Sequence, residues 1–181
     1  ARAEQHARAK GRIADKLRTF VGEGGAIGLD ASSTMQRLAA RLAPVRDLTV
    51  LTNGLDAFRT LHEHPGITAL LTGGTLDERT GSLVGPLATR SASDVMLRRL
   101  FVSASALDPQ LGSSESTLLD AEVKVALAAA AAEVVLAVDS SKLAHRAPAR
   151  CFPFERITVL VTELDPADER LDPYRDLVEL A

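Results

Sequence analysis

The stretch from Ala26 to Thr34, AIGLDASST, decides the fold of this chain. Its first four residues form an apolar run without alternation, which is typical of a parallel β-strand covered by helices on both faces. The run ends at Asp30. Three hydroxyl residues follow, any of which can cap the N-terminus of a helix: Ser32, Ser33 and Thr34. A strand that passes directly into a capped helix predicts an α/β unit.

The same alternation of strand and helix continues along the rest of the chain. Short apolar runs predict further strands, and stretches with apolar residues three or four apart predict helices. This order predicts an α/β fold, with three α/β/α layers around a mostly parallel, open sheet. No repeat or interdomain linker interrupts it, so we expect one domain over residues 1–181. The expected strands are 26–30, 48–51, 67–72, 100–103, 134–139 and 157–162, and the expected helices are 4–21, 33–42, 86–96 and 118–131, with one more opening after 54.

Three segments are less regular. Residues 75–85 are polar and predict a long loop, and residues 108–116, rich in Gly and Ser, predict another. The charged segment 165–180 is expected to be helical.

The composition excludes several classes of protein. A net charge of −3 leaves no overall footprint for nucleic acid, and the basic residues among the first 18 alternate with acids, as on a solvated helix face. The single cysteine, Cys151, excludes an internal disulfide and a cysteine zinc site, and we expect it to be a half-buried small apolar residue. No apolar run has the length of a membrane span and no signal peptide is visible, so we expect a cytoplasmic protein without a membrane partner.

Polar or glycine-bearing groups end the predicted strands. In an open parallel sheet these ends line one crevice, where ligands bind. The hydroxyls of residues 32–34 at a helix start favour an anion such as a phosphate, and Lys142 adds a positive charge nearby. Carboxylate and amide groups at the same edge suit sugar hydroxyls. The strand-end groups are Asp30, Thr52, Asn53, Thr72, Gly73, Gly74, Ser103 and Asp139.

Each of these groups also has a plainer interpretation. The hydroxyls at 32–34 are ordinary helix caps, Gly73 and Gly74 form a tight turn, Asn53 caps the next helix, and Lys142 is a solvated surface lysine. The functional interpretation gains weight because all of them fall at one edge of one predicted sheet.

Six blocks of sequence, in order along the chain, carry a resemblance to a known family. They are IGLDASST (27–34), LTVLTN (48–53), LTGGTL (71–76), SLVGPL (82–87), DAEVK (120–124) and VDSSK (138–142). Together they resemble the C-terminal effector domain of DeoR-type transcriptional repressors, over about residues 8–165.

The resemblance implies a sensor on a fold like that of sugar-phosphate isomerases and CoA transferases. Such a domain binds a phosphorylated sugar or polyol and signals to an N-terminal winged helix-turn-helix, absent from this chain, which binds operator DNA. The implied phosphate contacts are Ser32, Ser33, Thr34 and Lys142, and the implied sugar contacts are Asp30, Asn53 and Gly74. Of the pair Glu122 and Lys124, which point in different directions on a helix, Lys124 is the expected ligand contact. Thr52, Gly73, Ser103 and Ser114 complete the expected effector site, which includes no catalytic residue, metal or cofactor.

The chain departs from the family pattern in two places. The family's Gly-x-Asp-Gly-Ile-Asp after the fourth strand is SASALD (103–108) here, so Ser105 replaces an internal carboxylate. The family's Gly-Leu-Thr-Thr-Pro-Asn is GSSEST (112–117), in which Ser114 keeps a hydroxyl. The effector is therefore expected to differ from that of the relatives.

Two alternatives remain open. A sugar-phosphate isomerase on the same fold needs a general base in the crevice, but the chain offers Ser105 where related isomerases place an acid, and His145 is the single histidine expected near the crevice. We therefore expect no enzyme. The other alternative is an oligomerisation module without a ligand. A homodimer or homotetramer is expected for a regulator, since operator half-sites are usually read by symmetric pairs.

Overall fold

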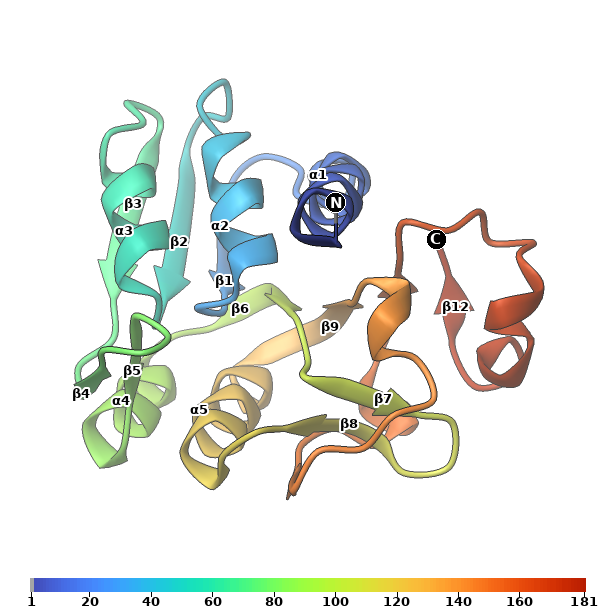
Figure 1. Cartoon of the computed structure of the whole chain (residues 1–181). Coiled ribbons are helices and arrows are strands. Elements are labelled where there is room, and N and C mark those ends of the chain that lie inside the picture. Colours follow the sequence, from blue (N-terminus) through green and yellow to red (C-terminus); the bar gives the residue numbers. More distant parts are fainter. Residues whose placement is uncertain (1) are drawn as a thin grey trace.

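The centre of the molecule is a parallel seven-stranded sheet (Figure 1). The computed structural model describes residues 2–181. All neighbouring strands of this sheet pair in parallel, in the order β12-β11-β9-β6-β1-β2-β3. The predicted parallel sheet is confirmed. Its strands are β1 (Ala26–Leu29), β2 (Leu48–Thr52), β3 (Ile67–Leu71), β6 (Leu97–Val102), β9 (Ala131–Ala137), β11 (Val159–Val161) and β12 (Glu179–Leu180).

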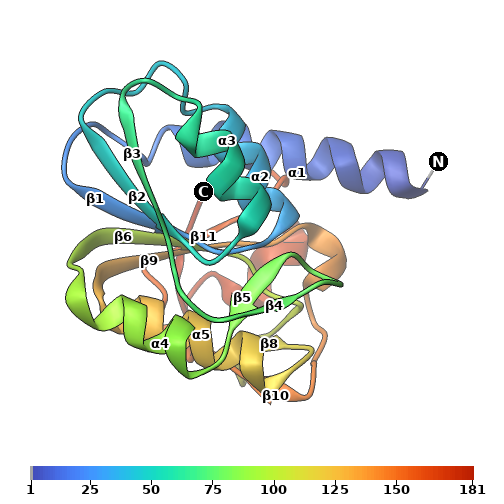
Figure 2. The ribbon, with the colours of Figure 1, turned by 90° about the vertical axis from the view of Figure 1, so that its left-hand side faces the viewer.

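Helices cover both faces of the sheet and complete the expected three layers (Figure 2). One face carries α1 (Arg2–Arg18), α2 (Ser33–Ala40) and α3 (Leu55–His62), and the other carries α4 (Pro86–Ser91) and α5 (Leu118–Ala129). Short 3-10 turns lie between the main elements: η1 (Ala92–Asp94), η2 (Ser140–Lys142), η3 (Phe154–Arg156) and η4 (Glu169–Tyr174). No helix among residues 2–181 is both long and apolar enough to cross a membrane.

The inner strands of the sheet have their alternate residues towards two separate cores. On β1, Ile27 and Leu29 belong to the core under α1, α2 and α3. Gly28 lies between them and faces the opposite core, where a Cβ would come within 2.9 Å of the Cδ1 atoms of Leu97 and Leu100. Burial of Ile27 and Leu29 contributes about 1.5–3 kcal/mol each to the first core, while Gly28 leaves room for Leu97 and Leu100 in the other.

The segment predicted as a loop over 75–85 is instead a β-hairpin, and that prediction was wrong. β4 (Thr75–Asp77) and β5 (Ser82–Val84) pair antiparallel, and Gly81 takes a φ of 69° in the turn. The hairpin is attached to the end of β2, because the Leu83 amide donates to the Asn53 carbonyl oxygen at 2.7 Å. A short polar hairpin has too few apolar residues to show a clear alternation in the sequence.

The second predicted loop, over 108–116, is also wrong. β7 (Ala106–Asp108) and β8 (Gly112–Glu115) form an antiparallel pair, which β10 (Ala149–Arg150) extends to three strands. The Asp108 carboxylate holds the turn by accepting hydrogen bonds from the amides of Gln110 and Leu111 at 2.8 and 2.9 Å. Strand pairing with a distant segment, rather than local periodicity, makes these residues extended.

The C-terminal segment does not form the expected helix over 165–180. It contains η4 and then β12, which pairs with β11 at the edge of the sheet. Pro173 lies within η4 and has no amide hydrogen to continue a helix. The neighbouring Tyr174 is fully buried, and its hydroxyl donates to the Leu107 carbonyl oxygen at 2.9 Å. The segment is therefore held by a tertiary contact to the small sheet.

We expect Gly112→Ala to destabilise the protein more than Gly24→Ala. Both glycines have a positive φ, 84° and 73°, so either alanine costs about 1–2 kcal/mol in backbone strain. A Cβ at Gly112 would also overlap the Phe152 carbonyl oxygen, whereas a Cβ at Gly24 meets nothing within 4 Å. Overpacking of this kind costs about 1–3 kcal/mol more. Urea unfolding at neutral pH measures the difference, and equal losses in the two variants would contradict this account of the small sheet.

Candidate functional site

A cavity of about 290 Å³ lies where the carboxyl ends of β1, β2 and β6 meet the hairpin, β8 and α5. In an open parallel sheet this edge is the usual place for a ligand. Most of its lining residues are polar, and they come from six separate segments of the chain. The lining residues are Ala31, Ser32, Asn53, Arg79, Thr80, Ser82, Ser103, Ala104, Ser105, Glu115, Ser116, Asp120, Val123 and Lys124.

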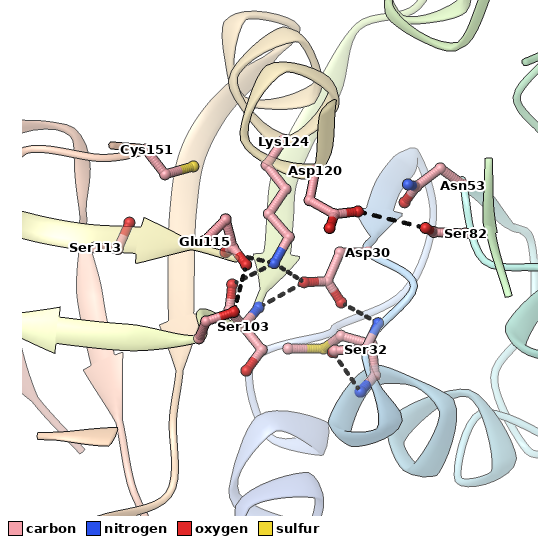
Figure 3. A network of polar contacts seen from close by, with 12 residues as sticks. Asp30, Ser32, Asn53, Ser82, Ser103, Ser113, Glu115, Asp120, Lys124 and Cys151 are labelled. Atoms are coloured by element: carbon pink, nitrogen blue, oxygen red, sulfur yellow. Dashed lines mark hydrogen bonds and ion pairs between the residues drawn. The ribbon is translucent and has the colours of Figure 1, made fainter. Parts of the chain in front are cut away.

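A buried ammonium and two carboxylates form the floor of the cavity (Figure 3). The Lys124 Nζ lies 2.7 Å from Glu115 Oε1 and 3.3 Å from Asp30 Oδ2, and it also donates to the Ser103 carbonyl oxygen at 2.9 Å. The ammonium thus donates two hydrogen bonds, to Ser103 and Glu115, and forms an ion pair with Asp30. The group therefore acts as a cross-link between β1, the end of β6, β8 and α5.

The Asp30 carboxylate, which is fully buried, organises the two loops beside it. Oδ1 accepts from the Ser32 amide at 2.8 Å, and Oδ2 accepts from the Ser103 amide at 2.7 Å. The Ser32 hydroxyl then accepts from the Met35 amide at 3.2 Å and caps α2. The start of α2 and the loop after β6 are thus positioned by one side chain.

The charges of the floor shift its pKa values in a consistent way. Burial alone would lower the pKa of Lys124, but the carboxylates of Asp30 and Glu115 outweigh it and raise that pKa above its ordinary value. Burial raises the pKa of Glu115, although Lys124 opposes the shift. Lys124 is therefore charged at neutral pH. Burial also raises the pKa of the half-buried Cys151 thiol to about 12, which makes it an unreactive side chain, as expected.

The loop after β6, which departs from the family pattern, still has a carboxylate beside it. Ser105, which stands where the family pattern has an acid, donates through its hydroxyl to Glu115 Oε2 at 3.1 Å. Glu115 is on β8, within the second segment that departs from the family pattern. The two departures are neighbours in space, and together they keep a negative charge at this wall of the cavity.

A second polar group lies across the cavity. The Asn53 side chain, 2% exposed, donates through Nδ2 to the Leu83 carbonyl oxygen at 3.1 Å. Its Oδ1 is buried and has no hydrogen-bond partner among residues 2–181. Beside it, the Ser82 hydroxyl donates to Asp120 Oδ1 at 3.4 Å. This wall presents acceptors, which suit the hydroxyl groups of a ligand.

Five of the residues predicted for the site meet at this cavity. Ser32, Asn53, Ser103 and Lys124 line it, and Asp30 lies directly beneath through its bonds to three of them. Glu122, the other member of the pair considered with Lys124, is exposed on α5. The orientation expected for this pair is confirmed.

The other predicted site residues do not line the cavity. Ser33 accepts a hydrogen bond from Lys10 Nζ at 2.8 Å, outside the cavity, and Thr34 is buried in the first turn of α2. Thr52 Oγ1 accepts from the Gly54 amide at 3.0 Å. Ser114 Oγ accepts from the Ala147 amide within the small sheet at 2.8 Å. These side chains stabilise the structure around the site.

The predicted glycine pair and Lys142 also lie outside the lining. Gly73 donates its amide to the Ser91 hydroxyl at 2.9 Å, and Gly74, with a φ of 130°, packs against Val84. Both therefore form the turn into the hairpin. Lys142 belongs to η2, after β9.

Three charged lining residues were missing from the predicted site: Arg79, Glu115 and Asp120. Asp120 had a usable signal, because it lies four residues before Lys124 and therefore on the same face of α5. Arg79 and Glu115 had none, because both fall in segments that were predicted to be loops. No histidine of the described chain lines the cavity, and His145 is exposed. Among residues 2–181 no cluster of His, Cys, Asp or Glu has the arrangement of a metal site.

Comparison with known families agrees with this arrangement. The family model described as the DeoR C-terminal sensor domain matches residues 5–164. The chain belongs to this family. The match covers the strands from β1 to β11 and all five α-helices except the first residues of α1.

Similar whole proteins are regulators. The HTH-type transcriptional regulator YulB of Bacillus subtilis is 33% identical over 160 residues, which are 87% of this chain and 62% of that protein. The HTH-type transcriptional regulator GlpR of Haloferax volcanii is 31% identical over 88% of this chain and 62% of its own length. The DeoR sensor domain in hand thus spans about 62% of the length of these relatives.

Solved structures share the fold at low identity. A D-ribose-5-phosphate isomerase in complex with phospho-erythronic acid superposes with a TM-score of 0.54 at 18% identity, covering 74% of this chain and 52% of that one. The DeoR sensor domain and the isomerase have the same α/β architecture, as the sequence predicted.

We expect Lys124→Met to lower the free energy of unfolding by about 3–5 kcal/mol at pH 7, because two buried carboxylates lose their cation. Burial then raises the pKa of Glu115 unopposed. A carboxyl with a raised pKa in the folded state favours folding in acid and disfavours it as the pH rises, so the loss should shrink towards pH 5. Urea unfolding between pH 5 and 8 measures this.

Glu115→Gln is the matched control. It removes one carboxylate, leaves Lys124 paired with Asp30, and keeps an oxygen facing the ammonium. The wild-type protein should lose stability relative to this variant as the pH rises from the ordinary value of 4.5 through the raised pKa of Glu115. If Lys124→Met and Glu115→Gln lose the same stability at every pH, the floor is not held by the ion pairs.

Proposed function

We propose that this chain is the ligand-sensing part of a DeoR-type transcriptional regulator and that residues 1–181 act as one sensing unit. The proposed ligand is a phosphorylated sugar or polyol, bound in the cavity at the sheet edge. Binding would control a helix-turn-helix on the N-terminal side, which reads operator DNA. The observation that carries the proposal is the polar cavity itself, in a chain that belongs to the DeoR sensor family.

The size and lining of the cavity support a small polyhydroxylated ligand. Its volume, about 290 Å³, is at the low end of the range for small-molecule sites. Asn53 Oδ1 and the Asp120 carboxylate are acceptors that suit the hydroxyl groups of a ligand. Ser32 lies at the N-terminus of α2, where the helix dipole favours an anion. The isomerase with the same fold is in complex with phospho-erythronic acid, a phosphorylated acid.

Catalysis is the less favoured function. An isomerase needs a base that is free to take a proton from carbon. Glu115 is instead bonded to Lys124 and to Ser105, and Asp120 accepts from Thr117 Oγ1 at 2.8 Å and caps α5 with it. The relatives are regulators, which agrees with binding rather than turnover.

Helix α1 offers a route for the signal. It is the first helix of the chain, and Lys10 Nζ on it bonds to the Ser33 hydroxyl, next to the cavity residue Ser32. His6 Nδ1 lies 3.8 Å from Asp139 Oδ2, at the end of β9. We propose that ligand binding moves the loop at Ser32, and with it α1, so that the helix-turn-helix domains of a dimer or tetramer are presented differently to the operator.

We expect a thermal-shift panel to show that at least one of ribose 5-phosphate, fructose 1-phosphate and glycerol 3-phosphate raises the Tm of the purified chain. A ligand that binds only the folded state adds about 2.7 kcal/mol of stability at a hundredfold excess over Kd. The matching free sugars and glycerol, together with inorganic phosphate, are the controls.

The result also separates the alternatives. No shift with any of the three phosphate esters would contradict the proposal and favour a ligand-free assembly module. Interconversion of ribose 5-phosphate and its ketose by the purified chain, followed by NMR, would favour an isomerase instead.

A further inference from the structure

The cavity contains more negative than positive charge at its floor and inner walls. Asp30, Glu115 and Asp120 contribute three carboxylates, against the one ammonium of Lys124. That ammonium donates to the Ser103 carbonyl oxygen and to Glu115 and is paired with Asp30, so the protein already compensates its charge. A phosphate near this floor would meet a net negative charge, which is unfavourable at short range in a partly buried site.

Arg79 is the other cation that lines the cavity, and it stands on the hairpin. Its side chain is 73% exposed, and its guanidinium is paired with Asp77, two residues earlier. The pair is loose: Nη2 lies 3.2 Å from Oδ2 and Nε lies 3.4 Å from Oδ1. A guanidinium presents two parallel donors that fit a phosphate as well as a carboxylate.

The chain contains a second copy of this local pair away from the cavity. Asp77-Glu78-Arg79 and Asp168-Glu169-Arg170 are the same tripeptide, and in both the arginine amide donates to the aspartate Oδ1 at 3.0 Å. At the second copy the Arg170 contacts are closer, 2.9 Å for Nε and 2.7 Å for Nη2. Arg170 does not line the cavity. It therefore matches Arg79 in local chemistry but not in position.

A buried acceptor without a partner lies beside the hairpin. Asn53 Oδ1 is without a partner among the described residues, while its Nδ2 is bonded to the hairpin carbonyl of Leu83. An unpaired buried oxygen is costly, and a ligand hydroxyl would satisfy it. A ligand that reaches Asn53 places its other end within the same cavity that Arg79 lines.

We propose that Arg79 binds the phosphate of the ligand, by exchanging Asp77 for the phosphate oxygens, and that Lys124 and Lys142 do not contact it. The inference rests on the proposed function and adds to it the residue that distinguishes a sugar phosphate from the free sugar. A dianionic phosphate attracts the guanidinium more strongly than one carboxylate does, so the exchange is favourable. The hairpin that the sequence analysis predicted as a loop is then a phosphate-binding arm.

The test is titration calorimetry of ribose 5-phosphate, fructose 1-phosphate and glycerol 3-phosphate into the wild-type chain, Arg79→Gln, Arg170→Gln and Lys142→Gln. For each ester that the wild type binds, Arg79→Gln should weaken binding by about 10- to 100-fold, as for other charge-assisted hydrogen bonds. Arg170→Gln and Lys142→Gln should stay within about twofold of the wild type, since both residues lie outside the cavity. Thermal unfolding without ligand should give similar Tm values for Arg79→Gln and Arg170→Gln.

The outcomes separate this inference from the proposed function. If the wild type binds an ester and Arg79→Gln binds it equally well, the inference is overturned while the sensing function stands. If Lys142→Gln alone loses the affinity, the phosphate is held after β9 instead, which also overturns it. If the wild type binds none of the three esters, both proposals fail together.

Discussion

The salt bridges of the buried Lys124 ammonium are the interaction on which the rest of the site depends. Four segments that are distant in the chain converge on one nitrogen: Asp30 after β1, Ser103 after β6, Glu115 on β8 and Lys124 itself on α5. Transfer of three charges from water is costly, and it is compensated only when every lone pair and proton has a partner. That requirement fixes the distances between the loops and makes the cavity above them a preformed one.

The same interaction explains why the residue that looked most like a ligand contact is a structural one. Lys124 lines the cavity, yet its ammonium donates to Ser103 and Glu115 and is paired with Asp30, so its charge is compensated within the protein. The groups with spare hydrogen-bonding capacity lie higher on the walls, at Asn53 Oδ1 and at Arg79. The ion pairs of Lys124 therefore position the walls of the cavity. Asn53 and Arg79 on these walls are the groups that can distinguish one ligand from another.

The departures from the family pattern are connected through this floor. Ser105 and Glu115 are ten residues apart in sequence and hydrogen-bonded in space. A hydroxyl at one position and a carboxylate at the other keep an acid beside Lys124, although the loop sequence alone suggests that the acid is lost. A pair of this kind is invisible to any comparison of single positions, because only the β7–β8 hairpin brings the two side chains together.

The sequence by itself determined the sheet, the family and the part of the site that follows strand ends. Unbroken apolar runs can be stable only between two helical layers, and the polar residues after them, such as Asp30, Asn53 and Ser103, must then meet at one edge. Only the tertiary structure decided the rest. The hairpins at 75–84 and 106–115 are too short to show a clear period, and β10 and β12 are held by pairing with β8 and β11. Arg79 and Glu115 enter the cavity from those hairpins, and whether Lys124 faces the ligand or the protein depends on where acceptors from other segments lie. Local pattern specifies which elements form; long-range contact specifies which side chains meet.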